Sequence, residues 1–150
     1  MPPTIALIGA LDTKGEDFAF AKAEIERRGL RALVINTGVI GEPAFPPEVS
    51  AAQVAEAGGS SLAALRKTGD RGAAIGVMAT GAAALVKRLY DAGRIQGVLG
   101  MGGSAGTTIA TTAMRGLPLG VPKVMVSTLA GGNVSPYVGD SDILMLPSIV

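Results

Sequence analysis

Short apolar runs alternate with segments of helical spacing along the chain, and this alternation limits the fold more than any other feature. Thr4–Gly9 is a continuous apolar run, as expected for a strand covered on both faces, and Leu30–Asn36 is predicted to be the second strand. Between them, Phe18, Ala21 and Ile25 recur at the spacing of one helix face. A strand, a helix and a strand in this order predict a parallel pair with a right-handed crossover.

The alternation continues to the end of the 150-residue chain, whose length fits one domain. Strands and helices that alternate in this way predict an α/β fold, in which a doubly wound, Rossmann-like parallel sheet is flanked by helices. The further strands are predicted at Ile95–Met101, Lys123–Thr128 and Ile143–Leu146, and the further helices at Glu48–Ala57, Ser61–Lys67, 71–92 and Ser104–Met114.

Residues that favour helix ends support several of these boundaries. Thr13 and Glu16 have the spacing of a capping box, which predicts a helix start at this point. Gly29 suits the left-handed position that follows a helix. Asp70 is expected to cap the long helix that runs to about Ala92.

The residue types that are missing exclude several kinds of site. The chain has no Cys and no His, which excludes disulfides, Cys/His zinc sites, thiol nucleophiles and His-based triads. The formal net charge of +1 gives no reason to expect nucleic acid or a membrane as a partner. The longest uncharged stretch, 95–114, contains a cluster of glycines and hydroxyls that is typical of a loop. Since the N-terminus also lacks the charged region of a secretory signal, we expect a cytoplasmic protein.

Charged residues are concentrated in the first two thirds of the chain. Residues 1–94 carry 21 of the 25 charges, whereas residues 95–150 carry four. Because residues 95–150 carry so few charges, we expect them to be buried in a core, against a partner protein or against a further part of the same chain. We therefore expect the sequence to be the N-terminal part of a longer protein.

Glycines and hydroxyl residues follow the predicted strands at their carboxyl ends, where open parallel sheets bind ligands. The loop after the third predicted strand is the richest. Its glycines let backbone N–H groups approach an anion, and the next helix directs its positive end to the same place. The alternative is that the glycines only form a tight turn between strand and helix. The ligand-binding residues predicted in this loop are Gly102, Gly103, Ser104, Gly106, Thr107 and Thr108.

This loop matches neither of the two common nucleotide-binding motifs. Gly97 and Gly102 have the spacing of a P-loop, but Gly103 stands where the motif requires Lys. Gly100, Gly102 and Gly106 are spaced differently from the dinucleotide fingerprint, and no acidic residue follows about 20 positions later. The pattern therefore favours a phosphate or another polar ligand over NAD.

Other polar residues are predicted at the same edge of the sheet. Lys14 can neutralise a phosphate and Asp12 can hold Mg²⁺. The alternative is that Asp12 caps the helix and Lys14 is only a solvated charge. Ser127 and Thr128 end the fourth predicted strand and either line the site or belong to a turn. The carboxylates of Asp140–Asp142 suit either a metal or, preferably, a capped surface turn.

Three motifs in this order resemble one family: Gly9–Lys14 (GALDTK), Gly97–Thr107 (GVLGMGGSAGT) and Leu117–Thr128 (LPLGVPKVMVST). It is the ATP-binding domain family typified by the tomato mosaic virus resistance protein, and the likeness extends over essentially the whole chain. The resemblance implies binding of ATP and Mg²⁺, a homodimer, and two α/β subdomains of which this is the N-terminal one. The positions that it places in the nucleotide pocket are Asp12, Thr13, Lys14, Gly102, Gly103, Ser104, Gly106, Thr107, Ser127 and Thr128.

The leading functional prediction is therefore an ATP–Mg²⁺-binding domain in which glycine-rich loops hold the phosphates. An interaction or assembly module with a regulatory or structural nucleotide is the first alternative. An NAD- or sugar-phosphate-dependent enzyme is the second. No residue stands out as a general base, so the sequence identifies no catalytic residue and no reaction.

Overall fold

All five strands belong to one parallel sheet in the order β2-β1-β3-β4-β5, in the computed structural model, which describes residues 1–148. This arrangement confirms the predicted α/β fold. The strands are β1 (Thr4–Gly9), β2 (Arg31–Asn36), β3 (Gly97–Gly102), β4 (Lys123–Ser127) and β5 (Leu144–Pro147). The helices are α1 (Gly15–Arg27), α2 (Ala51–Ala57), α3 (Leu62–Thr68), α4 (Arg71–Asp91), α5 (Ser104–Arg115) and α6 (Ser135–Val138).

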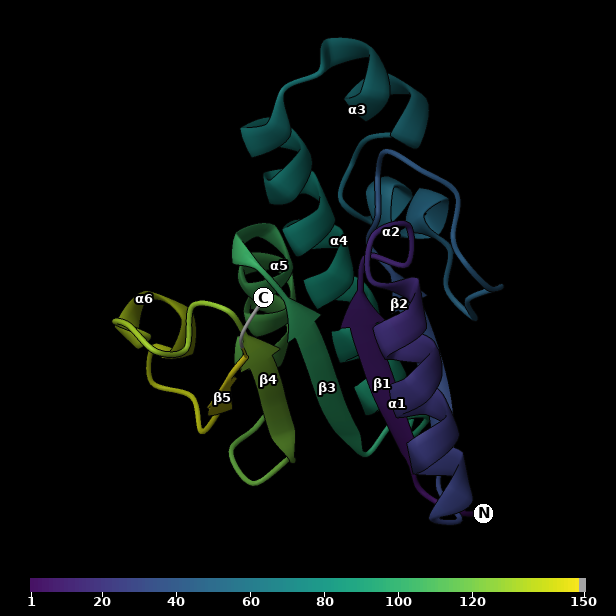
Figure 1. The fold of residues 1–150 in the computed structure, drawn as a ribbon, viewed down its shortest axis with the longest axis vertical. Helices are drawn as coiled ribbons and strands as arrows, with labels where there is room; N and C mark the ends of the chain where they lie inside the picture. Colours follow the sequence, from purple (N-terminus) through teal and green to yellow (C-terminus); the bar gives the residue numbers. More distant parts are fainter. Residues whose placement is uncertain (149–150) are drawn as a thin grey trace.

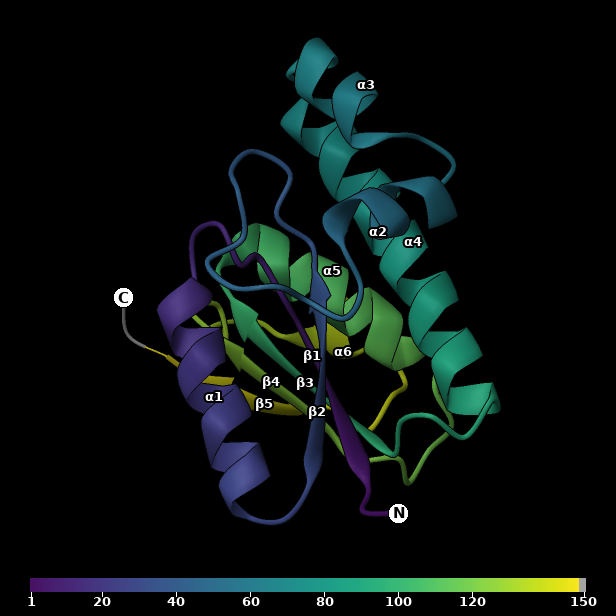
Figure 2. The same ribbon diagram turned by 90° about the vertical axis from the view of Figure 1, so that its right-hand side faces the viewer.

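Helices cover the two faces of the sheet unequally. Figure 1 shows α1 in front of β1 and β2, whereas α4 and α5 lie behind the sheet. Figure 2, turned by 90°, separates the layers: α1 lies on one side of the strands, and α2, α4 and α5 lie on the other. The sheet is thus doubly wound, with α1 on the face opposite to α2, α4 and α5.

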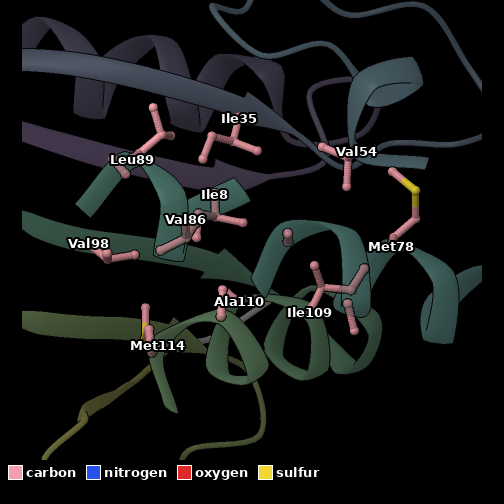
Figure 3. Close-up of a cluster of buried hydrophobic side chains, with 14 of the residues drawn as sticks. Ile8, Ile35, Val54, Met78, Val86, Leu89, Val98, Ile109, Ala110 and Met114 are labelled. Carbon is pink, nitrogen blue, oxygen red and sulfur yellow. The ribbon is translucent and has the colours of Figure 1, made fainter. Parts of the chain in front are cut away.

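The larger core lies between the sheet and the layer formed by α2, α4 and α5. Ile8, Val86 and Ile109 come from three different elements and meet there as buried side chains (Figure 3). Met78 and Met114 are fully buried in this cluster. A smaller core on the other face joins Leu7, Leu11, Phe18 and Val34, with Ala21 and Ile25 packed against it.

The predicted capping box at the start of α1 is wrong. Lys14, not Thr13, is the N-cap residue, and no side chain caps the helix. The physical reason is a turn at the end of β1, in which the N–H groups of Thr13 and Lys14 both approach the Ala10 carbonyl oxygen. This turn places Thr13 before the N-cap position. The predicted left-handed Gly29 is confirmed, with φ of 77°.

The predicted start of α2 at Glu48 is also wrong, because the helix begins at Ala51. Residues before it bond instead to β2: the Val49 N–H donates to the Val34 carbonyl. A capping box does start α2, but it is formed by Ser50 and Gln53. The predicted cap of α4 is confirmed, since the Asp70 side chain accepts from the Ala73 N–H at 3.0 Å.

Several strand boundaries also differ from the prediction: β2 begins at Arg31 rather than Leu30, and β4 ends at Ser127 rather than Thr128. β3 begins at Gly97 rather than Ile95; Gln96 before it lies in a bend, and its Nε2 donates to the Gly93 carbonyl. β5 is Leu144–Pro147, one residue later than predicted.

Within residues 1–148, α4 is the one helix that is long and apolar enough to cross a membrane. It packs against α2 and α5 at close range. A Cβ on Gly81 would lie 1.9 Å from the Val54 carbonyl oxygen, and one on Gly58 would lie 2.1 Å from the Val77 carbonyl oxygen. Glycine therefore lets the backbones of α2 and α4 meet, and α4 occupies the place of a core helix. The uncharged stretch 95–114 forms β3, a loop and α5, as expected.

Candidate functional site

The strand order reverses between β1 and β3. From β1 the chain passes through α1 to β2 on one side, whereas β3 pairs with the other side of β1. In doubly wound sheets, ligands bind at such a switch point, outside the carboxyl ends of the strands. The loops that follow β1 and β3 meet at this point, and they are the two loops that the sequence marks most strongly.

A pocket of about 340 Å³ opens at this edge, on the face of the sheet that carries α1. Three of the predicted site residues line it, namely Lys14, Gly102 and Thr128. The other lining residues are Asp17, Met101, Val126 and Ser148. The switch-point pocket, as we call this space, thus joins the ends of α1, β3, β4 and β5.

Four other hollows of the described residues are larger, and those of about 450 and 400 Å³ lie along α1 and beside the loop between α5 and β4. The remaining two are of about 500 and 420 Å³. The first is lined by Pro3, Thr4 and Arg31, at the amino ends of β1 and β2, and the second extends along α4 from the same region. Loops at the amino edge of a parallel sheet do not form the usual ligand site. Neither hollow contains a residue predicted for the site.

The helices that begin at the pocket lack side-chain caps. Among helices of seven or more residues, α2, α3 and α4 are capped by the side chains of Ser50, Ser61 and Asp70. The caps of α1 and α5 are Lys14 and Gly103, and neither forms a side-chain cap hydrogen bond. The first N–H groups of a helix have no partner within the helix, so an uncapped N-terminus leaves them for solvent or an anion.

The two uncapped helices differ in the charge of their first turns. In α1, Glu16 and Asp17 already place negative charge at the positive end of the helix. The first turn of α5 has no acidic residue. The N-terminus of α5, which follows the pocket residue Gly102, is therefore the better anion site, and Lys14 lines the same pocket.

Packing explains part of the glycine-rich loop but not all of it. A Cβ on Gly102 would lie 3.1 Å from the Gly106 Cα, so glycine allows α5 to approach β3 closely. A Cβ on Gly103 would meet nothing nearer than the Thr128 Oγ1, at 3.7 Å, which is an ordinary contact. The tight-turn alternative thus accounts for Gly102 and leaves Gly103 without a packing reason.

Two of the predicted hydroxyls lie beneath the site rather than on its surface. Thr107 and Ser127 are fully buried, and their hydroxyl oxygens are 2.6 Å apart in a hydrogen bond. The Ser127 Oγ also accepts from the Leu129 N–H at 3.0 Å. This pair joins α5 to the end of β4, so in this structure it holds the loops in place.

The remaining hydroxyls are more accessible. Ser104 is exposed at the N-terminus of α5, and Thr128 is half-buried in the pocket wall. The Thr128 N–H donates to the Gly102 carbonyl at 3.2 Å, which connects the loops after β3 and β4. Thr108 is half-buried and donates its hydroxyl to the Ser104 carbonyl. Thr13 is exposed in the turn before α1.

Asp12 faces the loop after β2. Its Oδ2 accepts from the Gly41 N–H at 2.9 Å, and its Oδ1 is buried without a hydrogen-bond partner. A Cβ on Gly38 would lie 2.3 Å from that Oδ1, so the chain at residue 38 lies directly over it. Asp12 therefore anchors the loop after β2 and is not among the residues that line the pocket.

These residues do not fit a magnesium ion held by the protein itself. In the part of the chain that the structure describes, no three Asp or Glu side chains gather where they could hold a metal. The one carboxylate predicted for this role, Asp12, has one oxygen bonded to Gly41 and the other covered by Gly38. The structure supports no step through a metal bound by side chains.

Asn36 is a residue of this edge to which the sequence gives little weight. Its side chain is buried, and its Oδ1 accepts from the N–H groups of Leu11 and Gly38 at 3.0 and 2.9 Å. One amide oxygen thus joins the loop after β1 to the loop after β2. The Asn-Thr-Gly motif is common where a strand passes into a loop, so the motif itself gives no reason to expect a bridge between two loops. The only signal in the sequence is the position of Asn36 at the end of β2.

The Asp140–Asp142 segment forms a structural contact away from the pocket, in agreement with the turn preferred from the sequence. Asp142 accepts from the Lys123 Nζ at 2.6 Å and from the Gly120 N–H at 2.8 Å. The Lys123 hydrogen bond and, next, the Gly120 hydrogen bond hold the pKa of the Asp142 carboxyl below its ordinary value. Lys123 itself is buried, which no local pattern of the sequence indicates.

Comparison with known proteins gives the family of this chain. The family model described as "Uncharacterised protein family (UPF0261) N-terminal domain" matches residues 3–150. A UPF0261 protein of Clostridium tetani is 51% identical over 150 residues, which are 100% of this chain and 37% of that protein. A UPF0261 protein of Rhizobium meliloti is 43% identical over 145 residues, which are 97% of this chain and 35% of that protein.

The resemblance to the tomato protein is also found, over a shorter stretch. The ToMV resistance protein Tm-1 of Solanum lycopersicum is 41% identical over 80 residues, which are 53% of this chain and 11% of that protein. The chain spans little more than a third of the length of the bacterial relatives named above. On the family match and on these identities, the chain belongs to the UPF0261 family, in the part that forms its N-terminal domain.

Proposed function

We propose that this domain binds ATP with Mg²⁺ at the switch-point pocket. The observation that carries the proposal is the uncapped N-terminus of α5, which has no acidic residue in its first turn and begins beside a pocket with Lys14 on its wall. Unpaired N–H groups, the positive end of a helix and a lysine together favour a phosphate.

Each part of the pocket has a separate role in this proposal. The N–H groups at the start of α5 bind phosphate oxygens, and Gly103 leaves the space above them free of a side chain. Lys14 neutralises phosphate charge from its place in the pocket lining, while Ser104 and Thr128 donate hydroxyl hydrogen bonds. Thr107, Ser127 and Asn36 position the loops without touching the ligand.

Mg²⁺ enters with the nucleotide in this proposal. Magnesium usually keeps several water ligands and is held by the substrate phosphates with one or two carboxylates. Since side chains of the described residues form no metal site, the phosphates supply most of its ligands. The proposal includes no reaction.

The proposal is tested by the thermal stability of the full-length protein with ATP and Mg²⁺. A ligand that binds only the folded state at 100 times its Kd stabilises it by about 2.7 kcal/mol, which raises the Tm measurably. Lys14→Ala removes a charge-assisted contact of about 1.5–3 kcal/mol, so we expect the Kd to rise roughly 10- to 100-fold.

Lys87→Ala is the matched control. It removes the same charge from an exposed lysine near the C-terminal end of α4, where Lys87 pairs only with the exposed Asp91. Its Kd for ATP is expected to stay unchanged. Absence of any Tm shift at millimolar ATP with Mg²⁺ would overturn the proposal, as would an equal loss of affinity in both variants. A larger shift with NAD than with ATP would favour the NAD-dependent alternative.

A further inference from the structure

One face of the sheet is left open over β3, β4 and β5. Along a strand, successive side chains point to opposite faces, and residues in register on neighbouring strands share a face. Leu7 lies in the core beside α1, and the register carries its face across the sheet through Leu99, Val124 and Leu144. Met101, Val126 and Leu146 form the next row of the same face. The open sheet face consists of Leu99, Met101, Val124, Val126, Leu144 and Leu146. Leu99 and Met101 lie at its margin, where they are partly buried against the smaller core beside α1.

The opposite face of β3 and β4 packs against α5. Val98 and Met125 point toward α5 and are 2% and 0% exposed. On the open sheet face, Leu144 is 56% exposed and Leu146 is 42% exposed. Figure 1 shows the reason: α1 lies in front of β1 and β2, and no described helix lies in front of β3, β4 or β5. All-parallel sheets occur almost only with both faces covered, so this face lacks a layer.

The two edges of the sheet also differ: the edge at β2 is closed, and the edge at β5 is open. The outer edge of β2 is closed, because Val49 bridges to Ile35 and the Glu48 carboxylate accepts from the Val34 N–H at 2.7 Å. Among residues 1–148, β5 pairs with β4 alone, so its outer edge is open. An open edge with large apolar side chains invites a further element of protein. The open face and the open edge meet at β5.

We propose that the polypeptide that follows residue 150 in the full-length protein packs on the open sheet face. The matched part of the bacterial relatives is little more than a third of their length and corresponds to the N-terminal domain of the family, so most of each relative follows it. Ser148 lies at the margin of this face: it lines the switch-point pocket, and its N–H donates to the Ser127 carbonyl at 3.0 Å. A segment that continues from Ser148 begins beside the surface that needs a cover.

The chemistry of the surface fits a covalently attached apolar segment. None of the six side chains of the open sheet face is charged or polar, which suits a permanent contact such as the interface inside a folded chain. Attachment through Ser148 gives the segment a high effective concentration, so it outcompetes a second molecule of the protein. The open sheet face shares Met101 and Val126 with the switch-point pocket, so a segment on this face also borders that pocket. The inference itself rests on the apolar rows and not on Lys14 or α5.

The test measures thiol accessibility in the full-length protein. Residues 1–150 contain no Cys, so a thiol placed in this domain is compared with the unsubstituted protein to subtract any background from the rest of the chain. Leu146→Cys and Leu144→Cys place thiols on the open sheet face. Leu119→Cys is the control, because Leu119 is 73% exposed in the loop between α5 and β4.

We expect the thiols at residues 144 and 146 to react at least tenfold more slowly than the control thiol in the native protein. All three are expected to react equally after denaturation. The two face positions are independent probes, so one variant that fails to fold leaves the other to decide. Equal native rates at the face and control positions would overturn the proposal. Slow labelling that becomes fast when the protein is diluted would also overturn it, because it would show a second copy as the cover.

Discussion

Lys123 and Asp142 form an ion pair of 2.6 Å in which the lysine side chain is fully buried and the aspartate is half-exposed. The Lys123 ammonium has three donors, and all three are used: two on the carbonyls of Pro118 and Val121, and one on Asp142. Asp142 also accepts from the Gly120 N–H. The pair therefore joins the start of β4, the loop before it and the segment before β5.

The first prediction concerns acid stability through this pair. Because the folded-state pKa of Asp142 is lowered, the contribution of its carboxylate is fully present above the ordinary Asp pKa of about 3.9. As the pH falls below that value, the unfolded chain binds a proton before the folded chain does, so stability is lost. We expect Asp142→Asn to lower the Tm at pH 7 and to flatten the fall in Tm below about pH 4. Asp140→Asn, at an exposed neighbouring carboxylate, is the control, and an equal effect of both substitutions would contradict the prediction.

The second prediction compares two glycines of α4. Gly76 has open space around its Cβ position, so Gly76→Ala should stabilise the helix by about 1 kcal/mol. Gly81 lies against the Val54 carbonyl, and Gly81→Ala should destabilise the protein by about 1–3 kcal/mol because α2 must move. Urea unfolding measures both values. Equal effects of the two substitutions would show that α2 and α4 do not meet closely.

The third prediction concerns the buried hydroxyl pair of Thr107 and Ser127. Thr107→Val keeps the shape of the side chain but leaves the Ser127 hydroxyl without this partner, at a cost of about 1–3 kcal/mol. Combining it with Ser127→Ala should cost less than the sum of the two single substitutions, since the residues share one hydrogen bond. Thermal unfolding of the four proteins in the cycle measures the coupling. Strict additivity would mean that the hydroxyls do not interact.

The fourth prediction concerns the connection between the loops after β1 and β2. Asn36→Ala removes the acceptor of two buried N–H groups and should destabilise the protein by about 2–4 kcal/mol. Amide hydrogen exchange should become faster at Leu11 and Gly38. Asn133→Ala is the control: Asn133 is exposed and accepts only from the Ser135 N–H, so a change within about 0.5 kcal/mol is expected. Unchanged exchange at Leu11 in Asn36→Ala would count against the bridging role.

Several parts of the structure follow from the sequence alone. The apolar runs and the Phe18, Ala21 and Ile25 spacing predicted the parallel α/β sheet, because period and connection length are local properties of a chain. The position of the candidate site at the carboxyl edge of the sheet was also predicted, because parallel strands all end on one side. Asp70 and Gly29 marked helix ends correctly, since caps depend on a few neighbouring residues.

Tertiary structure alone decided the rest. Which hydroxyls face the pocket depends on how β3 and β4 pair, and this pairing buries Thr107 and Ser127 against each other. The burial of Lys123 and the position of Asp12 beneath Gly38 depend on contacts between residues far apart in the sequence, which no local pattern encodes. Likewise, the alternation of strands and helices predicted a sheet covered on both faces, but only the strand order showed that α1 covers β1 and β2 and leaves β3, β4 and β5 open. Local periodicity determines which elements form, whereas long-range pairing determines which side chains meet.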